Sequence, residues 1–172
     1  VAAIAKAEAA CKQKKFRTIK LPVAAAFHSA LMQRAQAPFA AALEKVTVTP
    51  NDIRVYANTS GGPYPAEPAQ VKSILGDHLL NAVNFVDEIK NLHQAGARVF
   101  IEVGPKTVLT GLVRQILKGE AIHALATDAG NGRNFGIVDL ATTLGKLAAL
   151  GCPVDLPEWE NPLDNPRQPK MQ

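Results

Sequence analysis

The feature that most limits the possible fold is a strand, a tight turn and a helix in residues 97–116, followed by another apolar segment. Residues 97–105, ARVFIEVGP, are mostly apolar and end in Gly-Pro, which predicts a buried strand and a turn. Apolar residues then recur three and four apart as far as Ile116, which predicts a helix. The short apolar segment 121–127, AIHALAT, predicts the next strand. This succession indicates an α/β fold.

The rest of the chain is predicted to be mostly helical. Apolar spacing and helix propensity predict helices over residues 1–14, from Ser29 to about Lys45, over 67–78, over 82–95, and to about Leu150 after a glycine-rich loop. Ser29 is expected to cap its helix, while Pro38 either kinks that helix or begins a second one. Strands are predicted at 16–23 and 53–57, the latter entering a turn. The proline-rich segment after Gly151 is typical of a linker.

Composition excludes several classes of protein. The chain has 172 residues, 47% hydrophobic and 20% charged, which is typical of a soluble globular protein of about one domain. No targeting segment is expected at its start, and no run reaches the roughly 18 apolar residues of a membrane span, so we expect no membrane partner. The net charge of +4 is mild, so no nucleic-acid partner is expected, although a weakly basic surface suits an acidic carrier protein.

The two cysteines, Cys11 and Cys152, lie far apart and have no CxxC spacing. They therefore indicate neither a metal site nor a disulfide framework. Free thiols in a reducing cytosol are the simplest interpretation, and we expect the protein to be cytoplasmic.

The most suggestive group for chemistry is residues 24–32, AAAFHSALM, in which His28 lies between a predicted strand and a predicted helix. Functional residues of α/β proteins lie at such junctions. A histidine can accept a proton from a hydroxyl at neutral pH and return it when a partner fixes its tautomer. From the residues alone, His28 is either such a group or a structural histidine.

Three segments together resemble a known family. LPVAAAFHSALM (21–32), HLLNAVNF (78–85) and ARVFIEVGPKTVLTGLV (97–113) are similar to the C-terminal half of malonyl-CoA:acyl carrier protein transacylases. The same signature occurs in acyltransferase domains of polyketide and polyunsaturated fatty acid synthases. The resemblance implies the C-terminal part of an α/β-hydrolase-like acyltransferase core. Residues 1–23 would end a ferredoxin-like small subdomain, 24–127 would form the core, and 128–172 would form a terminal helix and the linker that follows such domains.

The resemblance also implies a reaction. In the family, a serine in a G-x-S-x-G turn takes the acyl group from coenzyme A and passes it to the phosphopantetheine thiol of an acyl carrier protein. His28 matches the family's catalytic histidine, a general acid and base. No G-x-S-x-G occurs in these 172 residues. We therefore expect the serine outside this chain and the chain alone to be inactive.

Coenzyme A thioester is then the substrate, the carrier's phosphopantetheine is the acceptor, and no bound cofactor is expected. Expected partners are the acyl carrier protein, the remainder of the acyltransferase domain and an adjacent ketosynthase domain. The family's carboxylate-binding arginine follows the nucleophile, and we assign that role to no arginine of this chain.

Three further residues are site candidates by resemblance. His78 stands where the family usually has Gln, near a backbone carbonyl that orients the catalytic histidine, and it is either part of that arrangement or an ordinary helix-end residue. Malonyl-selective polyketide synthase domains often read H-A-F-H at the catalytic histidine. Phe27 therefore favours malonyl, because its ring would crowd an α-methyl group, while Ala25 departs from the pattern.

Two alternatives to acyl transfer remain open. A thioesterase on a similar core would release the acyl group to water, and an inactive module would only dock a carrier protein or a neighbouring synthase domain. Among the other polar residues, His93 and His123 are expected to be structural. Glu102, at the end of its strand, is expected to accept hydrogen bonds from nearby loop amides.

Overall fold

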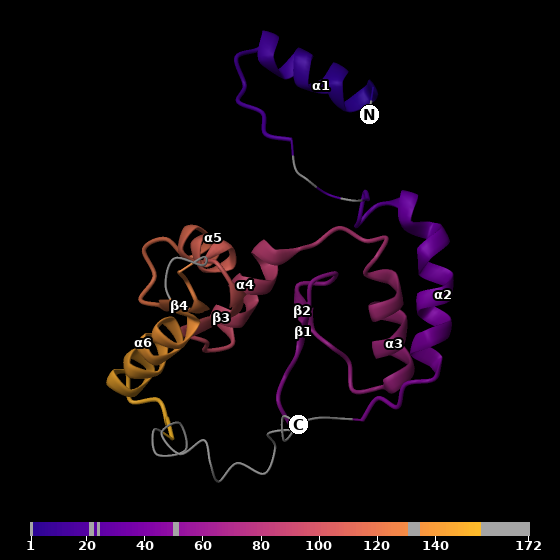
Figure 1. The fold of residues 1–172 in the computed structure, drawn as a ribbon. Helices are drawn as coiled ribbons and strands as arrows, with labels where there is room; N and C mark the ends of the chain where they lie inside the picture. The colour runs from indigo at the N-terminus through magenta and orange to yellow at the C-terminus, as the bar shows by residue number, and fades with distance from the viewer. Residues whose placement is uncertain (1, 21–22, 24, 50–51, 131–134, 156–172) are drawn as a thin grey trace, which may run out of the picture. The chain divides into compact units, whose positions relative to one another are not determined.

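The computed structural model describes residues 2–20, 23, 25–49, 52–130 and 135–155. The chain divides into two compact units, Val1–Val83 and Asn84–Gln172, and each is described by itself. Figure 1 shows the order of the elements. The domain boundaries expected at residues 23 and 127 remain predictions.

The first unit begins with helix α1 (Ala2–Gln13), as predicted. The predicted strand 16–23 is wrong for residues 16–20, which lie in no strand, while residues 21 and 22 lie outside the described part. A strand requires a neighbouring strand to pair with its backbone groups. No described residue pairs with this segment, so its apolar alternation alone does not produce a strand.

Ser29 begins the next helical segment, as predicted. It is the N-cap of a short 3₁₀ helix, η1 (Ala30–Met32), and its Oγ accepts from the Leu31 amide at 3.4 Å. Helix α2 (Gln33–Glu44) follows directly and contains Pro38. Pro38 therefore lies within one helix and does not begin a second one.

A small hairpin and a second helix complete this unit. Strands β1 (Tyr56–Ala57) and β2 (Gly62–Pro63) pair antiparallel, so the strand predicted at 53–57 is shorter than expected. Helix α3 (Pro68–Asp77) lies beside α2 (Figure 1). Gly76 of α3 faces Ala40 of α2, and the Gln36 amide donates to the Asp77 carboxylate at 2.7 Å. A small residue and a polar contact thus hold the helix pair together.

The second unit has the predicted α/β order. It contains α4 (Phe85–Gln94), β3 (Val99–Pro105), α5 (Val108–Ile116), β4 (His123–Asp128) and α6 (Gly136–Ala149). β3 and β4 pair in parallel, with Val99 opposite His123 and Glu102 opposite Ala126. A parallel pair needs a crossover connection, which α5 supplies. The core of this unit consists of Ile89, Val113, Leu117 and Ala124.

Two further expectations concern the ends and the surroundings of the chain. The linker expected after Gly151 falls largely on residues 156–172, outside the described part. Among the described helices, none combines the length and the apolar character that crossing a bilayer would require.

Candidate active site

His28 has an unusual backbone conformation. Its φ is +62°, in the left-handed region that residues with a Cβ rarely occupy. Its N–H donates to the carbonyl oxygen of Leu79 at 2.9 Å. Such a conformation persists only where surrounding contacts hold it, and it is common at functional sites.

The His28 ring is oriented by the same loop. Its Nδ1 lies 2.9 Å from the carbonyl oxygen of His78 and 3.1 Å from that of Asn81. A carbonyl oxygen only accepts hydrogen bonds, so Nδ1 carries the proton in the neutral ring. Nε2 then has the lone pair. His28 is an exposed residue, and the arrangement therefore presents a proton acceptor of defined tautomer at the surface of this unit.

The loop that supplies these carbonyls is itself fixed by the end of α3. The backbone N–H of His78 donates to Leu75 O at 3.3 Å, and those of Leu80 and Asn81 both donate to Asp77 O at 3.0 Å. The peptide groups of residues 78–81 are thus tied to the helix end. The carbonyl oxygens of His78, Leu79 and Asn81 all contact His28.

Two of these partners, Leu79 and Asn81, lie in the resembling segment 78–85, but the sequence did not single them out. Both act through the main-chain carbonyl, a group that every residue carries. Only the fold of the loop places them beside His28. By contrast, His78 was a candidate by resemblance, and the structure brings it against His28.

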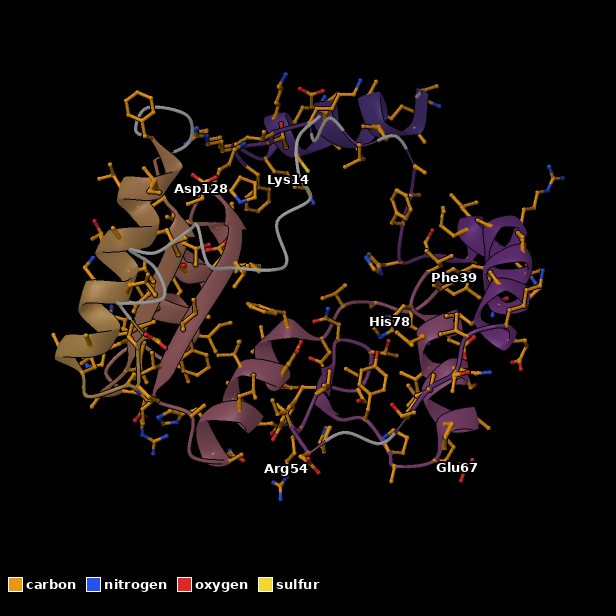
Figure 2. The ribbon with its side chains drawn as sticks, turned by 60° about the horizontal axis from the view of Figure 1, so that its bottom comes forward. Lys14, Phe39, Arg54, Glu67, His78 and Asp128 are labelled. Carbon is orange, nitrogen blue, oxygen red and sulfur yellow. The ribbon has the colours of Figure 1, made fainter. Side chains whose placement is uncertain are left out.

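The His78 side chain has a partner of its own. Its Nε2 lies 3.3 Å from the hydroxyl oxygen of Tyr64, and the two ring centroids are 6.3 Å apart at an interplanar angle of 40°. Figure 2 labels His78 beside the end of α3. Tyr64 follows β2, and its N–H donates to Val55 O at 2.8 Å. Sequence reasoning missed Tyr64, because no motif links it to residue 78.

The two selectivity candidates, Ala25 and Phe27, lie three residues and one residue before the histidine. Phe27 is 51% exposed, and Ala25 is partly buried. A large apolar ring with half its surface open, next to an oriented histidine, can contact a bound molecule. The structure shows where these residues lie, and their role remains a proposal.

Ser29, the neighbouring hydroxyl, is engaged elsewhere. Its Oγ donates to the Ala26 carbonyl at 2.7 Å and accepts from the Leu31 amide. These contacts are those of a helix cap. Ser29 is therefore not placed as a nucleophile.

Glu102, in the second unit, behaves as a helix cap. Its carboxylate accepts from the amides of Leu109 and Thr110 at 3.0 and 2.8 Å and from the Thr110 hydroxyl at 2.7 Å. Burial acts to raise the pKa of this carboxyl, but these hydrogen bonds and that of Val108 outweigh it and lower the pKa. The expected acceptance of loop amides is thus seen at the start of α5.

The two other histidines lie in the second unit. His93 Nε2 lies 3.8 Å from a carboxylate oxygen of Glu120, and His123 is an exposed residue at the start of β4. Within the described ranges, no group of three or more His, Cys, Asp or Glu side chains is arranged to hold a metal ion.

Comparisons with known proteins place this geometry in context. No family model matches the chain. It is 35% identical over 135 residues to a polyunsaturated fatty acid synthase polypeptide from Thraustochytrium, and this match covers 76% of the chain and 5% of that protein. It is 37% identical over 100 residues to a polyketide biosynthesis malonyl CoA-acyl carrier protein transacylase from Bacillus subtilis, a match that covers 58% of the chain and 34% of that protein.

The fold is also found among solved structures. A malonyl CoA-acyl carrier protein transacylase from Clostridium perfringens superposes with a TM-score of 0.73 at 28% identity, covering 87% of this chain and 44% of that one. The chain thus spans less than half the length of these relatives. The predicted fold class, part of an acyltransferase core, is confirmed by this match.

Proposed function

We propose that this chain supplies the histidine half of an acyltransferase site, because it is similar to part of a polyunsaturated fatty acid synthase and of malonyl CoA-acyl carrier protein transacylases. The reaction is transfer of a malonyl group from coenzyme A to the phosphopantetheine thiol of an acyl carrier protein. His28 is the general acid and base. The serine nucleophile belongs to a part of the polypeptide outside these 172 residues.

One observation carries this proposal: the two carbonyl oxygens that face His28 Nδ1. They leave the lone pair on Nε2, the atom that must take a proton. They can still accept from Nδ1–H after Nε2 has taken a proton. The two carbonyls share the single Nδ1–H, and the residue that they orient is exposed.

The first half of the reaction acylates the serine. Nε2 takes the proton of the serine hydroxyl as its oxygen attacks the thioester carbon of malonyl-CoA. The carbon–sulfur bond then breaks, and Nε2 returns the proton to the departing coenzyme A sulfur. The product is a malonyl ester of serine and free coenzyme A.

The second half repeats the proton transfers with a new nucleophile. Nε2 takes the proton of the phosphopantetheine thiol, and the sulfur attacks the ester carbon. The carbon–oxygen bond breaks and the serine oxygen recovers the proton. Because the histidine serves both halves, its loss should slow both.

The test uses the complete polypeptide that carries this chain, with malonyl-CoA labelled in the malonyl group and a phosphopantetheine-bearing carrier protein. His28→Ala should reduce acyl-enzyme formation and transfer by about 10²- to 10⁴-fold, the usual contribution of a general base. His123→Ala, at an exposed histidine of β4, is the matched control and should retain both rates. Equal rates in wild type and His28→Ala would overturn the proposal.

The fate of the label separates the alternatives. Label on the carrier protein supports transfer. Label released as free malonate from the wild type, without carrier labelling, would identify a thioesterase. A wild-type protein that binds the carrier but forms no acyl-enzyme would be a docking module.

A further inference from the structure

The His78 side chain and the Tyr64 hydroxyl form a pair behind the histidine site. We infer that Tyr64 is a positioning residue, which acts through the His78 ring to hold the carbonyl that orients His28. This inference rests on the proposed function and adds to it. It concerns this chain in particular, because the family that the chain resembles usually has Gln where His78 stands.

The geometry links the three residues in series. Tyr64 Oη lies 3.3 Å from His78 Nε2, and the carbonyl oxygen of the same His78 lies 2.9 Å from His28 Nδ1. His78 is therefore held on its side-chain end by Tyr64 and on its main-chain end by His28. Fixing the side chain limits rotation about the bonds that join it to the peptide group.

The Tyr64 end of this series is anchored. Its N–H donates to Val55 O at 2.8 Å, one residue beyond the paired strands β1 and β2. Tyr64, at an intermediate exposure, also lies with its ring against that of His78, tilted by 40°. The hairpin thus provides a fixed support for a loop that otherwise depends on the end of α3.

The loop needs such support because His78 lies at a helix end. It is the C-cap of α3, and its N–H makes a long bond of 3.3 Å to Leu75 O. Helix ends fray, so a side-chain contact there adds to the backbone hydrogen bonds that tie residues 78–81 to α3. Within this loop, the Tyr64 contact is the side-chain bond that holds residue 78.

The inference is tested in the complete polypeptide by comparing Tyr64→Phe with Tyr56→Phe. Tyr56 is the other tyrosine of the chain and lies in β1 of the same hairpin, so its variant controls for loss of a phenol hydroxyl. Tyr64→Phe should lower the rate of acyl-enzyme formation about 5-fold with KM for malonyl-CoA unchanged, the effect of losing one hydrogen bond. Tyr56→Phe should leave the rate unchanged.

A double-mutant cycle distinguishes positioning from packing. His78→Leu keeps the backbone carbonyl but removes the ring, so Tyr64→Phe should cause no further loss in that background. An equal loss in both backgrounds would show that Tyr64 acts through other contacts and would overturn the inference. So would a Tyr64→Phe variant with the wild-type rate.

A chemical readout tests the bond without relying on turnover. Diethyl pyrocarbonate modifies unprotonated imidazole nitrogens, and peptide mass spectrometry locates the product. His78 should react several-fold faster in Tyr64→Phe than in wild type or Tyr56→Phe, because its Nε2 loses the hydroxyl. Unchanged His78 reactivity overturns the inference, whereas a wild type with no acyl transfer overturns the proposed function and the positioning role that rests on it.

Discussion

The backbone N–H of His28 donates to the carbonyl oxygen of Leu79 at 2.9 Å, while the His28 backbone has φ +62°. The adjacent carbonyls of His78 and Asn81 face Nδ1 of the same residue. One loop therefore fixes both the main chain and the ring of His28. The orientation of the ring depends on a backbone conformation that is unfavourable by itself.

The left-handed backbone of His28 should be visible in stability. Among variants without the ring, His28→Gly should be more stable than His28→Ala by about 1 kcal/mol, because glycine adopts positive φ without a Cβ penalty. Hydrogen exchange of the peptide that spans residues 28–32, in the complete protein, measures the difference. At exposed Lys45, whose φ is −82°, the order should reverse, so that Lys45→Ala is more stable than Lys45→Gly. The same order at both positions would contradict the argument.

Loss of the Glu102 carboxylate should loosen the start of α5. Glu102→Gln keeps the size of the side chain. It replaces the carboxylate, whose two oxygens accept from Leu109 and Thr110, with a neutral amide that has one oxygen. We expect a local cost of about 1 kcal/mol and roughly 5-fold faster exchange of these two amides. Glu67→Gln is the matched control, because Glu67 is the N-cap of α3 without a side-chain capping bond.

The contribution of Glu102 should depend on pH in one direction. Its pKa in the folded protein is lowered from the ordinary 4.5, so its stabilisation is complete above about pH 4.5 and is lost as the pH falls through the lowered pKa. Protection of the α5 amides, corrected for intrinsic exchange, should therefore fall in acid in the wild type. In Glu102→Gln it should stay level over the same range, and a parallel fall would count against this account.

The contribution of Glu88, in α4, to stability should change with pH in the opposite direction. Burial raises its pKa from the ordinary 4.5, and its Oε2 is buried without a hydrogen-bond partner among the described residues. The ionised form is therefore disfavoured in the folded protein, and stability is lost as the pH rises through the raised pKa. Glu88→Gln should slow exchange of α4 amides at pH 7. Asp87→Asn, which alters a 3.0 Å contact with Asn84, should not slow it.

Phe27 should influence the choice of acyl group if the proposed function holds. Phe27→Ser removes a half-exposed ring beside His28 and should shift the ratio of malonyl to methylmalonyl transfer about 10-fold toward methylmalonyl. Competition between the two coenzyme A thioesters measures this ratio directly. Ala25→His, which restores the family pattern, should not shift it in that direction. An unchanged ratio in Phe27→Ser would show that Phe27 does not select the acyl group.

The sequence by itself determined the order of helices and strands in the second unit. It also determined the Ser29 cap and the place of His28 directly before a helical segment. Apolar spacing, turn residues and capping residues are local properties, so they can be read from neighbouring positions. The resemblance to acyltransferases added His28, His78, Phe27 and Ala25 as candidates, because side-chain identity is what a motif records. Their roles remain proposals.

The tertiary structure alone decided the rest. Residues 16–20 alternate as a strand would but have no described partner, since pairing depends on distant residues. Leu79 and Asn81 act through carbonyls that any residue offers, and Tyr64 meets His78 only because a hairpin and a helix end lie together. The positive φ of His28 likewise follows from contacts with a loop about fifty residues away in the chain.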